Sequence, residues 1–398
     1  MRAWAELLRV SALFSVPGDA LAGAAAVSRR PGRGTALAIG ASLCLYEAGM
    51  ALNDWADRDE DAIDRPHRPI PSGRISPAAA LGAAGVMTAA GLALAARAGR
   101  PALTVASGLA ATVWAYDLHL KHTKAGPAAM ATARSLDLLL GATATATAGV
   151  GPRRGGRPDN VAGTSVIADA IRTPGPVAAA PPPPARGGLT EALPALPAAL
   201  VLGAHTYGVT AVSRHETQGG STGTPLAVLA TTTALAAAVL GEWRGRSVDR
   251  AGAGSARSVG TSTADGARSE GAGRSGRARV LGSGPHTSGP LARAADSAAS
   301  PPALAARLEG LPGRAADPTR LLTLALTGAY LRTAGPPLLH AALNPSPPLT
   351  QRAVGGGIRA MIPLQAALAA RAGAPLTGLA VMGLVPLARS LARKVSLT

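Results

Sequence analysis

Long apolar segments alternate with short polar connections along most of the chain. Each segment approaches the roughly 20 residues that a helix needs to cross a bilayer. Alanine and glycine are frequent in them, and small residues let membrane helices pack closely. The candidates are residues 11–28, 35–53, 77–97, 101–117, 127–149, 192–212, 224–242, 318–342, 355–371 and 374–391. The pattern predicts an all-α polytopic membrane bundle of nine or ten transmembrane helices, in which the segment at 355–371 is the weakest because of its glycines.

Two polar low-complexity stretches interrupt this pattern. Residues 151–188 contain four consecutive prolines, and residues 244–317 are rich in Gly, Ser, Arg and Ala. Because neither has an apolar period, both are predicted to be loops without a packed core. The bundle is therefore expected in three parts: residues 1–150 with the main motifs, residues 189–243, and residues 318–398.

The composition supports a membrane protein. Of 398 residues, 47% are hydrophobic and 15% are charged, whereas soluble domains average about 25% charged. The net charge of +17 suits contact with anionic membrane lipids, and the lack of interleaved aromatic residues disfavours nucleic acid as a partner. The single cysteine, Cys44, excludes a disulfide framework. Met1 to Ala26 lacks a clear stop and is interpreted as a first span rather than a signal peptide. The oligomeric state is left open.

The most informative polar stretch begins at Asn53, where the apolar run 35–52 ends. Asp54, Asp57 and Asp61 are spaced i, i+3 and i+7, so they share one face if the helix continues. Their mutual repulsion would be offset by a hard cation such as Mg²⁺, which prefers one or two carboxylates plus phosphate oxygens. Basic or titratable side chains follow at Arg58, Arg65, His67, Arg68 and Arg74. Acids that hold a metal beside arginines suit a diphosphate, and the alternative is a solvated acidic loop.

Two further polar connections, residues 116–124 and 213–216, follow the fourth and sixth predicted spans. Because the acidic stretch follows the second span, all three fall on one side of the membrane, as a single active site requires. Basic residues in the second and fourth connections favour the cytoplasmic side, although Arg29, Arg30 and Arg33 would then face outward. We expect a multi-pass protein of the cell membrane with a cytoplasmic active-site face.

The motif Asn53-Asp54-x-x-Asp57-x-x-x-Asp61 resembles the first aspartate-rich motif of the UbiA superfamily of intramembrane prenyltransferases. Tyr116-Asp117-x-x-Leu120-Lys121-x-Thr123 is similar to that superfamily's second conserved patch, in the form of its archaeal ether-lipid branch. Residues 65–73 resemble the family's Arg-Pro-x-Gly-type continuation. The resemblance covers most of the hydrophobic chain and neither low-complexity stretch.

This resemblance implies a bundle around a central cavity that opens laterally to lipid. It also implies Mg²⁺-dependent transfer of a prenyl group from a polyprenyl diphosphate to a small acceptor, aromatic or polyol phosphate, with release of diphosphate. The implied metal ligands are Asp54, Asp57 and Asp61, with Asn53 orienting the site. The implied phosphate contacts are Arg65, Arg68 and Lys121, and Tyr116 would bond the diphosphate or stabilise the cation. The alternatives are interfacial snorkelling for Lys121 and an interfacial anchor for Tyr116.

The sixth connection departs from the family pattern, which has a second acidic motif, Asp-x-x-x-Asp, there. Val212 stands where the first acid should fall, and Glu216 can serve as the second and as a further metal ligand. Either one Mg²⁺ is held less fully, or Arg214 and His215 replace part of the charge of a second Mg²⁺. The alternative is a plain polar turn.

Other polar residues lie within predicted spans. Asp19, Arg134 and Asp137 are expected to face a cavity or each other, as a structural pair or as lining of an acceptor pocket. His205, Gln365 and His340 are interpreted as packing or interfacial residues. The main competing function is a non-catalytic, ion-binding, transporter-like membrane protein, although no internal repeat of the kind common in transporters is evident.

Overall fold

In the computed structural model, residues 2–148, 188–216, 221–255 and 317–396 are described. The chain divides into two compact units, Met1–Gly241 with Pro318–Thr398, and Glu242–Asp317. Only the end of one helix and Asp317 are described in the second unit. Most of the two stretches predicted as loops lies outside the described residues, and the fold below is that of the first unit.

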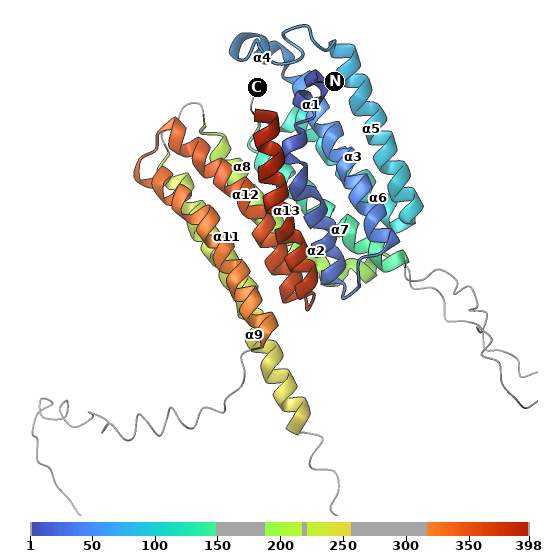
Figure 1. Ribbon diagram of the computed structural model, residues 1–398, viewed down its shortest axis with the longest axis vertical. Helices are drawn as coiled ribbons and strands as arrows, with labels where there is room; N and C mark the ends of the chain where they lie inside the picture. Colours follow the sequence, from blue (N-terminus) through green and yellow to red (C-terminus); the bar gives the residue numbers. More distant parts are fainter. Residues whose placement is uncertain (1, 149–187, 217–220, 256–316, 397–398) are drawn as a thin grey trace, which may run out of the picture. The chain divides into compact units, whose positions relative to one another are not determined.

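All regular elements in the described ranges are helices, which confirms the all-α prediction (Figure 1). They are α1 (Arg2–Leu7), η1 (Val10–Ser15), α2 (Val16–Ala26), α3 (Arg33–Ala56), α4 (Arg58–Asp64), α5 (Pro77–Ala98), α6 (Arg100–Ala115), η2 (Tyr116–Leu120), α7 (Gly126–Ala148), η3 (Leu189–Ala195), α8 (Leu196–Ser213), α9 (Gly223–Ser255), α11 (Pro318–Leu343), α12 (Pro347–Arg371) and α13 (Pro375–Ser396). Each of the ten apolar segments read from the sequence largely coincides with one helix or with two consecutive helices of this set. Helix α9 continues to Ser255, beyond the expected start of the second loop at residue 244.

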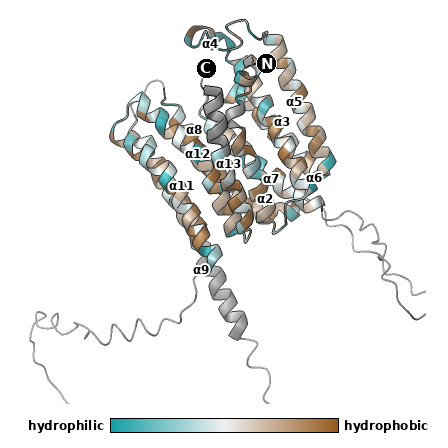
Figure 2. Cartoon of the chain, viewed as in Figure 1, coloured by the Kyte–Doolittle hydropathy of each residue, from teal (hydrophilic) through white to brown (hydrophobic). Residues whose placement is uncertain are grey.

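Five helical segments in the described ranges are long and apolar enough to span a bilayer: Arg33–Ala56, Pro77–Ala98, Leu189–Ser213, Gly223–Gly241 and Pro347–Arg371. Two shorter apolar helices, Leu13–Ala26 and Pro375–Pro386, accompany them. Brown, hydrophobic residues cover much of the helices, whereas hydrophilic residues gather at α4 (Figure 2). The molecule is therefore a membrane protein, although α6, α7 and α11 do not meet this criterion of length and hydropathy.

Small residues bring neighbouring helices into close contact. A methyl group added to Gly141 of α7 would lie 2.3 Å from the Cα atom of Ala20 in α2. In α12, a methyl group on Gly357 would lie 2.5 Å from a methyl carbon of Val209. Gly356 and Gly357, two of the glycines that weakened the predicted segment at 355–371, therefore serve interhelical packing, and the segment belongs to a helix that is long and apolar enough to span a bilayer.

The three polar connections lie at one end of the bundle, as predicted. The first connection includes α4, which follows the end of α3 (Figure 1). The second consists of η2, which continues α6, and the turn before α7, and the third joins the end of α8 to α9. Lys121, beyond η2, pairs with Asp57, and Arg214, beyond α8, donates a hydrogen bond to the carbonyl oxygen of Thr123. The count of spans from the sequence therefore placed these connections correctly.

Candidate functional site

The helix that carries the acidic motif breaks at Asp57. Helix α3 ends at Ala56 and α4 begins at Arg58, with Asp57 between them at φ −88° and ψ 3°. Backbone hydrogen bonds on both sides, from the Asp57 amide to Asn53 and from the Asp61 amide to Asp57, hold this junction. The sequence places Asp54, Asp57 and Asp61 on one face only if the helix continues, and the break at Asp57 means that this condition is not met.

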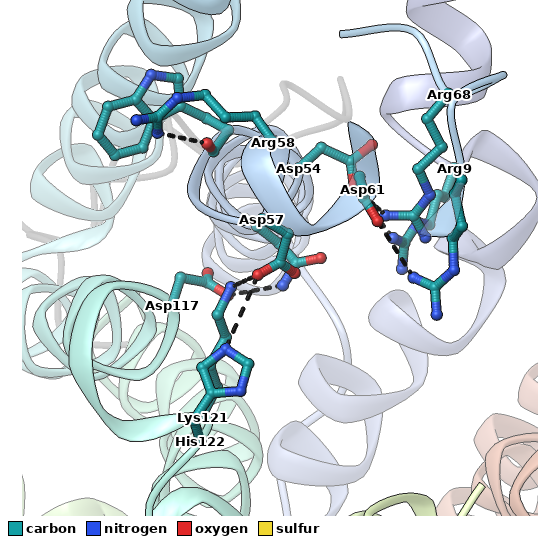
Figure 3. Close-up of polar contacts among 12 residues, drawn as sticks. Arg9, Asp54, Asp57, Arg58, Asp61, Arg68, Asp117, Lys121 and His122 are labelled. Atoms are coloured by element: carbon teal, nitrogen blue, oxygen red, sulfur yellow. Dashed lines mark hydrogen bonds and ion pairs between the residues drawn. The ribbon is translucent and has the colours of Figure 1, made fainter. Parts of the chain in front are cut away.

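Asp54 and Asp61 form a first cluster with three arginines. Both carboxylates are buried, with exposed fractions of 4% and 2%. Arg68 lies 2.6 Å from Asp61 and 3.4 Å from Asp54, so it bridges the two acids. Arg9 reaches Asp54 at 3.1 Å, and Arg65 reaches Asp61 at 3.4 Å (Figure 3). Two predicted phosphate-binding arginines thus neutralise two of the predicted metal ligands.

Asp57 belongs to a second cluster. Its carboxylate forms an ion pair with Lys121 and lies 4.0 Å from His122 (Figure 3). Beside it, Asn53 donates a hydrogen bond to Asp117 at 3.2 Å. The Lys121 side chain is only 10% exposed, which argues against snorkelling into water as its sole role.

The third connection adds Arg214 and Glu216. Arg214 contacts the turn before α7 through the Thr123 carbonyl oxygen. Glu216 is half-buried, and its burial raises its pKa, while the nearby charge of Arg65 partly opposes the rise. Val212, where the family pattern expects an acid, is 1% exposed in the hydrophobic core. Val212 therefore contributes only apolar packing.

Within the described ranges, one group of side chains places metal-ligating atoms close together: Asp57, Glu60 and His122, whose ligand atoms all lie within 4.8 Å of one another. The predicted metal set of Asp54, Asp57, Asp61 and Glu216 does not form such a group, because Asp54 and Asp61 are turned to arginines. The oxygen-rich donors still fit a hard divalent cation such as Mg²⁺.

A cavity of about 250 Å³ opens among α3, α6 and α7. Arg9, Asn53, Tyr116 and Asp117 line it at the end that carries the acidic motif, and its middle is mostly apolar. The other lining residues are Ser42, Leu45, Tyr46, Gly49, Met50, Leu109, Val113, Met130, Ala133, Arg134 and Asp137. With a rise of about 1.5 Å per residue, Ser42 and Asn53 lie roughly 16 Å apart along α3. The predicted central cavity is therefore present, with polar groups at both ends.

The profile of the UbiA prenyltransferase family matches residues 13–215, just over half of the 398 residues. The chain belongs to the UbiA prenyltransferase family. The match covers α2 to α8 and, apart from Arg9, includes the residues of the two clusters and of the cavity lining, so the resemblance read from the acidic motif is confirmed.

Several named proteins are similar in sequence to this UbiA-family chain. Digeranylgeranylglyceryl phosphate synthase of Methanopyrus kandleri is 37% identical over 128 residues, 31% of this chain and 45% of that protein. Chloroplastic chlorophyll synthase of Oryza sativa is 61% identical over 33 residues, 8% and 9% of the two chains. The chain thus spans less than half the length of these relatives. A solved UbiA homologue from Aeropyrum pernix K1 superposes with a TM-score of 0.46 at 15% identity, covering 87% of this chain and 96% of that one.

The far end of the cavity in this UbiA-family chain holds a buried polar network. Arg134 pairs with Asp19 at 2.6 Å, and Ser42 donates a hydrogen bond to Asp137. The Gln365 amide also donates to Asp19, at 2.7 Å, so Gln365, which is fully buried, packs inside the bundle and takes part in this polar network. Arg134 and Asp137 both line the cavity, but Arg134 forms its ion pair with Asp19, on α2.

His205, by contrast, has a structural role. Its two ring nitrogens lie 3.0 Å from the Tyr330 hydroxyl and 2.9 Å from the Gly357 carbonyl oxygen. These contacts tie α8 to α11 and α12, in agreement with the interpretation of His205 as a packing residue.

Four residues at the site were not among those predicted: Arg9, Glu60, Asp117 and His122. Asp117 and His122 lie inside the second polar connection, so their proximity to Tyr116 and Lys121 was the available signal. Glu60 lies within the acidic stretch itself. Arg9 is 45 residues from Asp54 in the sequence, and no spacing pattern links them.

Proposed function

We propose that this chain catalyses the Mg²⁺-dependent transfer of a prenyl group from a polyprenyl diphosphate to a small acceptor, with release of diphosphate. The observation that carries this proposal is the ion pair between Asp57 and Lys121 beside one end of a cavity whose middle is mostly apolar. At this position the carboxylate and ammonium groups would contact the anionic diphosphate at the rim of the cavity, and the apolar prenyl chain would lie inside the cavity.

Asp54, Asp57 and Asp61 would hold Mg²⁺, with Glu216 as a further ligand from the third connection. When bound, the metal neutralises charge that develops on the leaving diphosphate. Asp54 and Asp61 are buried and already oriented by Arg68, which fits acids kept ready for an ionic ligand.

The basic side chains would bind the phosphate oxygens, since charge-assisted hydrogen bonds to phosphate are strong and directional. Arg65, Arg68, Lys121 and Arg214 surround the acids on the three connections. Asn53, held against Asp117, would orient this rim.

The cavity would hold the reacting end of the donor. Leu45, Met50 and Val113 give it an apolar wall, which excludes water from a reactive allylic cation. The phenol of Tyr116 lines the same wall, where it would hydrogen-bond the diphosphate or stabilise the cation through its ring.

The names of several relatives support one class of acceptor. Four similar proteins are named digeranylgeranylglyceryl phosphate synthase, which favours a polyol phosphate acceptor over an aromatic one. We place the protein in the cell membrane with the acidic end of the bundle facing the cytoplasm, because short basic connections prefer that side.

Purified full-length protein, incubated with radiolabelled geranylgeranyl diphosphate, geranylgeranylglyceryl phosphate and Mg²⁺, tests this function. We expect diphosphate release and a prenylated product, both lost in Asp54→Ala and retained in Arg97→Ala, which changes an exposed residue of α5. Ion binding or transport without diphosphate release would support the transporter-like alternative instead.

A further inference from the structure

Arg9 reaches the acidic site from an unusual backbone position. It lies between α1 and η1 with φ 47° and ψ 47°, a left-handed conformation that residues with a Cβ atom rarely adopt. Its guanidinium group lies 3.1 Å from Asp54 and also lines the cavity. An arginine held in a strained conformation beside a buried carboxylate is a candidate for a functional role.

The segment that carries Arg9 is fixed at two other points. Leu7 is fully buried in a cluster with Ala51 and Leu52 of α3. Arg74 donates hydrogen bonds of 2.7 and 3.1 Å to the two carboxylate oxygens of Glu6. The contacts of Leu7 and Glu6 therefore fix the backbone beside Arg9 and hold Arg9 near Asp54.

The charges around Asp54 and Asp61 are more than balanced. The two carboxylates face the guanidinium groups of Arg9, Arg65 and Arg68. A divalent cation that binds without diphosphate would have to displace these guanidinium groups from the carboxylates. The cation and the guanidinium groups would then lie close together and repel each other, because both are positively charged. A diphosphate brings oxygens to which the displaced guanidinium groups can turn.

We propose that Arg9 is an exchangeable counter-ion, which holds Asp54 in the metal-free protein and passes to the diphosphate when cation and diphosphate bind. The proposal rests on the proposed function and goes beyond it. It makes the binding of the two ligands cooperative, and such coupling is reciprocal between the ligands. In this arrangement Glu6 and Arg74 are positioning residues.

Two separate binding measurements on the full-length protein in detergent test this exchange. Mn²⁺ serves as the divalent probe without phosphate, with free Mn²⁺ followed by electron paramagnetic resonance. Radiolabelled inorganic pyrophosphate serves as the second probe, measured by equilibrium dialysis at a saturating concentration of Mn²⁺. We expect Arg9→Ala to tighten Mn²⁺ binding by about fivefold or more and to weaken pyrophosphate binding by a similar factor, the range typical of coupled sites.

The opposite signs of these two effects are the decisive result. A general structural defect would weaken both ligands, and a residue that only binds phosphate would leave the Mn²⁺ affinity unchanged, so either outcome overturns the proposal. Arg9→Lys keeps the charge and should stay near the wild-type values for both probes, while Arg97→Ala controls for loss of a distant arginine. If the wild-type protein binds neither probe, the proposed function fails, whereas failure of the exchange alone leaves wild-type binding intact.

Discussion

Lys121 and Asp57 form an ion pair that joins the segment after η2 to the junction of α3 and α4, 64 residues apart in the sequence. The pair fixes the second polar connection against the acidic motif. It also leaves Lys121 mostly shielded from solvent, where an ammonium group interacts more strongly with phosphate than it would in water.

We expect Lys121→Met to lower kcat/KM for diphosphate release by about 100-fold or more, the effect of losing one preorganised charge-stabilising group. Lys121→Arg should retain part of the activity, because it keeps the charge. Steady-state assays with the prenyl diphosphate as varied substrate measure this. A change of less than twofold in Lys121→Met would mean that Lys121 serves only as an interfacial anchor.

Asp54 and Asp59 provide a matched pair of acids in one motif. Asp54 is buried and bonded to two arginines, whereas the Asp59 side chain is 87% exposed and pairs with Arg58. We expect Asp54→Asn to abolish measurable transfer and Asp59→Asn to stay within about twofold of wild type, since exposed ion pairs contribute little. The same radiolabelled assay compares them, and equal losses would contradict the assignment of Asp54 to the site.

The sequence predicted the helices and their common polar end because both depend on local hydropathy and on counting spans. It did not predict the orientations of the acids, because these depend on a single break at Asp57. A regular 3.6-residue period contains no sign of that break. Two of the partners also lie at separations that form no helical pattern: Arg9 is 45 residues from Asp54, and Arg68 is 14 residues from Asp54 and 7 from Asp61.

The polar network at the far end of the cavity was also only partly predictable. Arg134 and Asp137 are three residues apart, which suggested a pair within α7. The actual partner of Arg134 is Asp19, 115 residues away on α2. Proximity in sequence favoured the local pair, whereas the close approach of α2 and α7 at Gly141 brings the distant carboxylate within reach.

Val212 and Glu216 allow a test of the altered third connection. Because Val212 is buried in the core, Val212→Asp would bury an unpaired charge, which is strongly destabilising. We expect Val212→Asp to lower the thermal unfolding temperature without lowering the Mg²⁺ concentration needed for half-maximal activity. Glu216→Gln, at a half-buried position near Arg65, should instead raise the Mg²⁺ concentration for half-maximal activity while the unfolding temperature changes little. If Val212→Asp instead lowered the Mg²⁺ concentration needed for half-maximal activity, the acid that the family pattern has at this position could be restored.

Gly141 and Gly82 should respond oppositely to alanine. At Gly141 a methyl group would meet the backbone of Ala20, whereas at Gly82 nothing lies within 4 Å. We expect Gly141→Ala to destabilise the bundle by about 1–3 kcal/mol through overpacking, and Gly82→Ala to be neutral or stabilising by up to about 1 kcal/mol in a helix interior. Reversible unfolding in mixed micelles measures both. Equal stabilities would mean that α2 and α7 are not in close contact.

Arg134 tests whether the far end of the cavity recognises the acceptor. Its guanidinium group pairs with Asp19 and faces the cavity, so it can donate further hydrogen bonds to a polar acceptor. We expect Arg134→Gln to raise the KM for geranylgeranylglyceryl phosphate by about tenfold or more, the range for losing a hydrogen bond to a charged group, with the KM for the prenyl diphosphate unchanged. Arg97→Gln, an exposed arginine of α5, is the matched control. A lower unfolding temperature with both KM values unchanged would assign Arg134 and Asp19 a structural role alone.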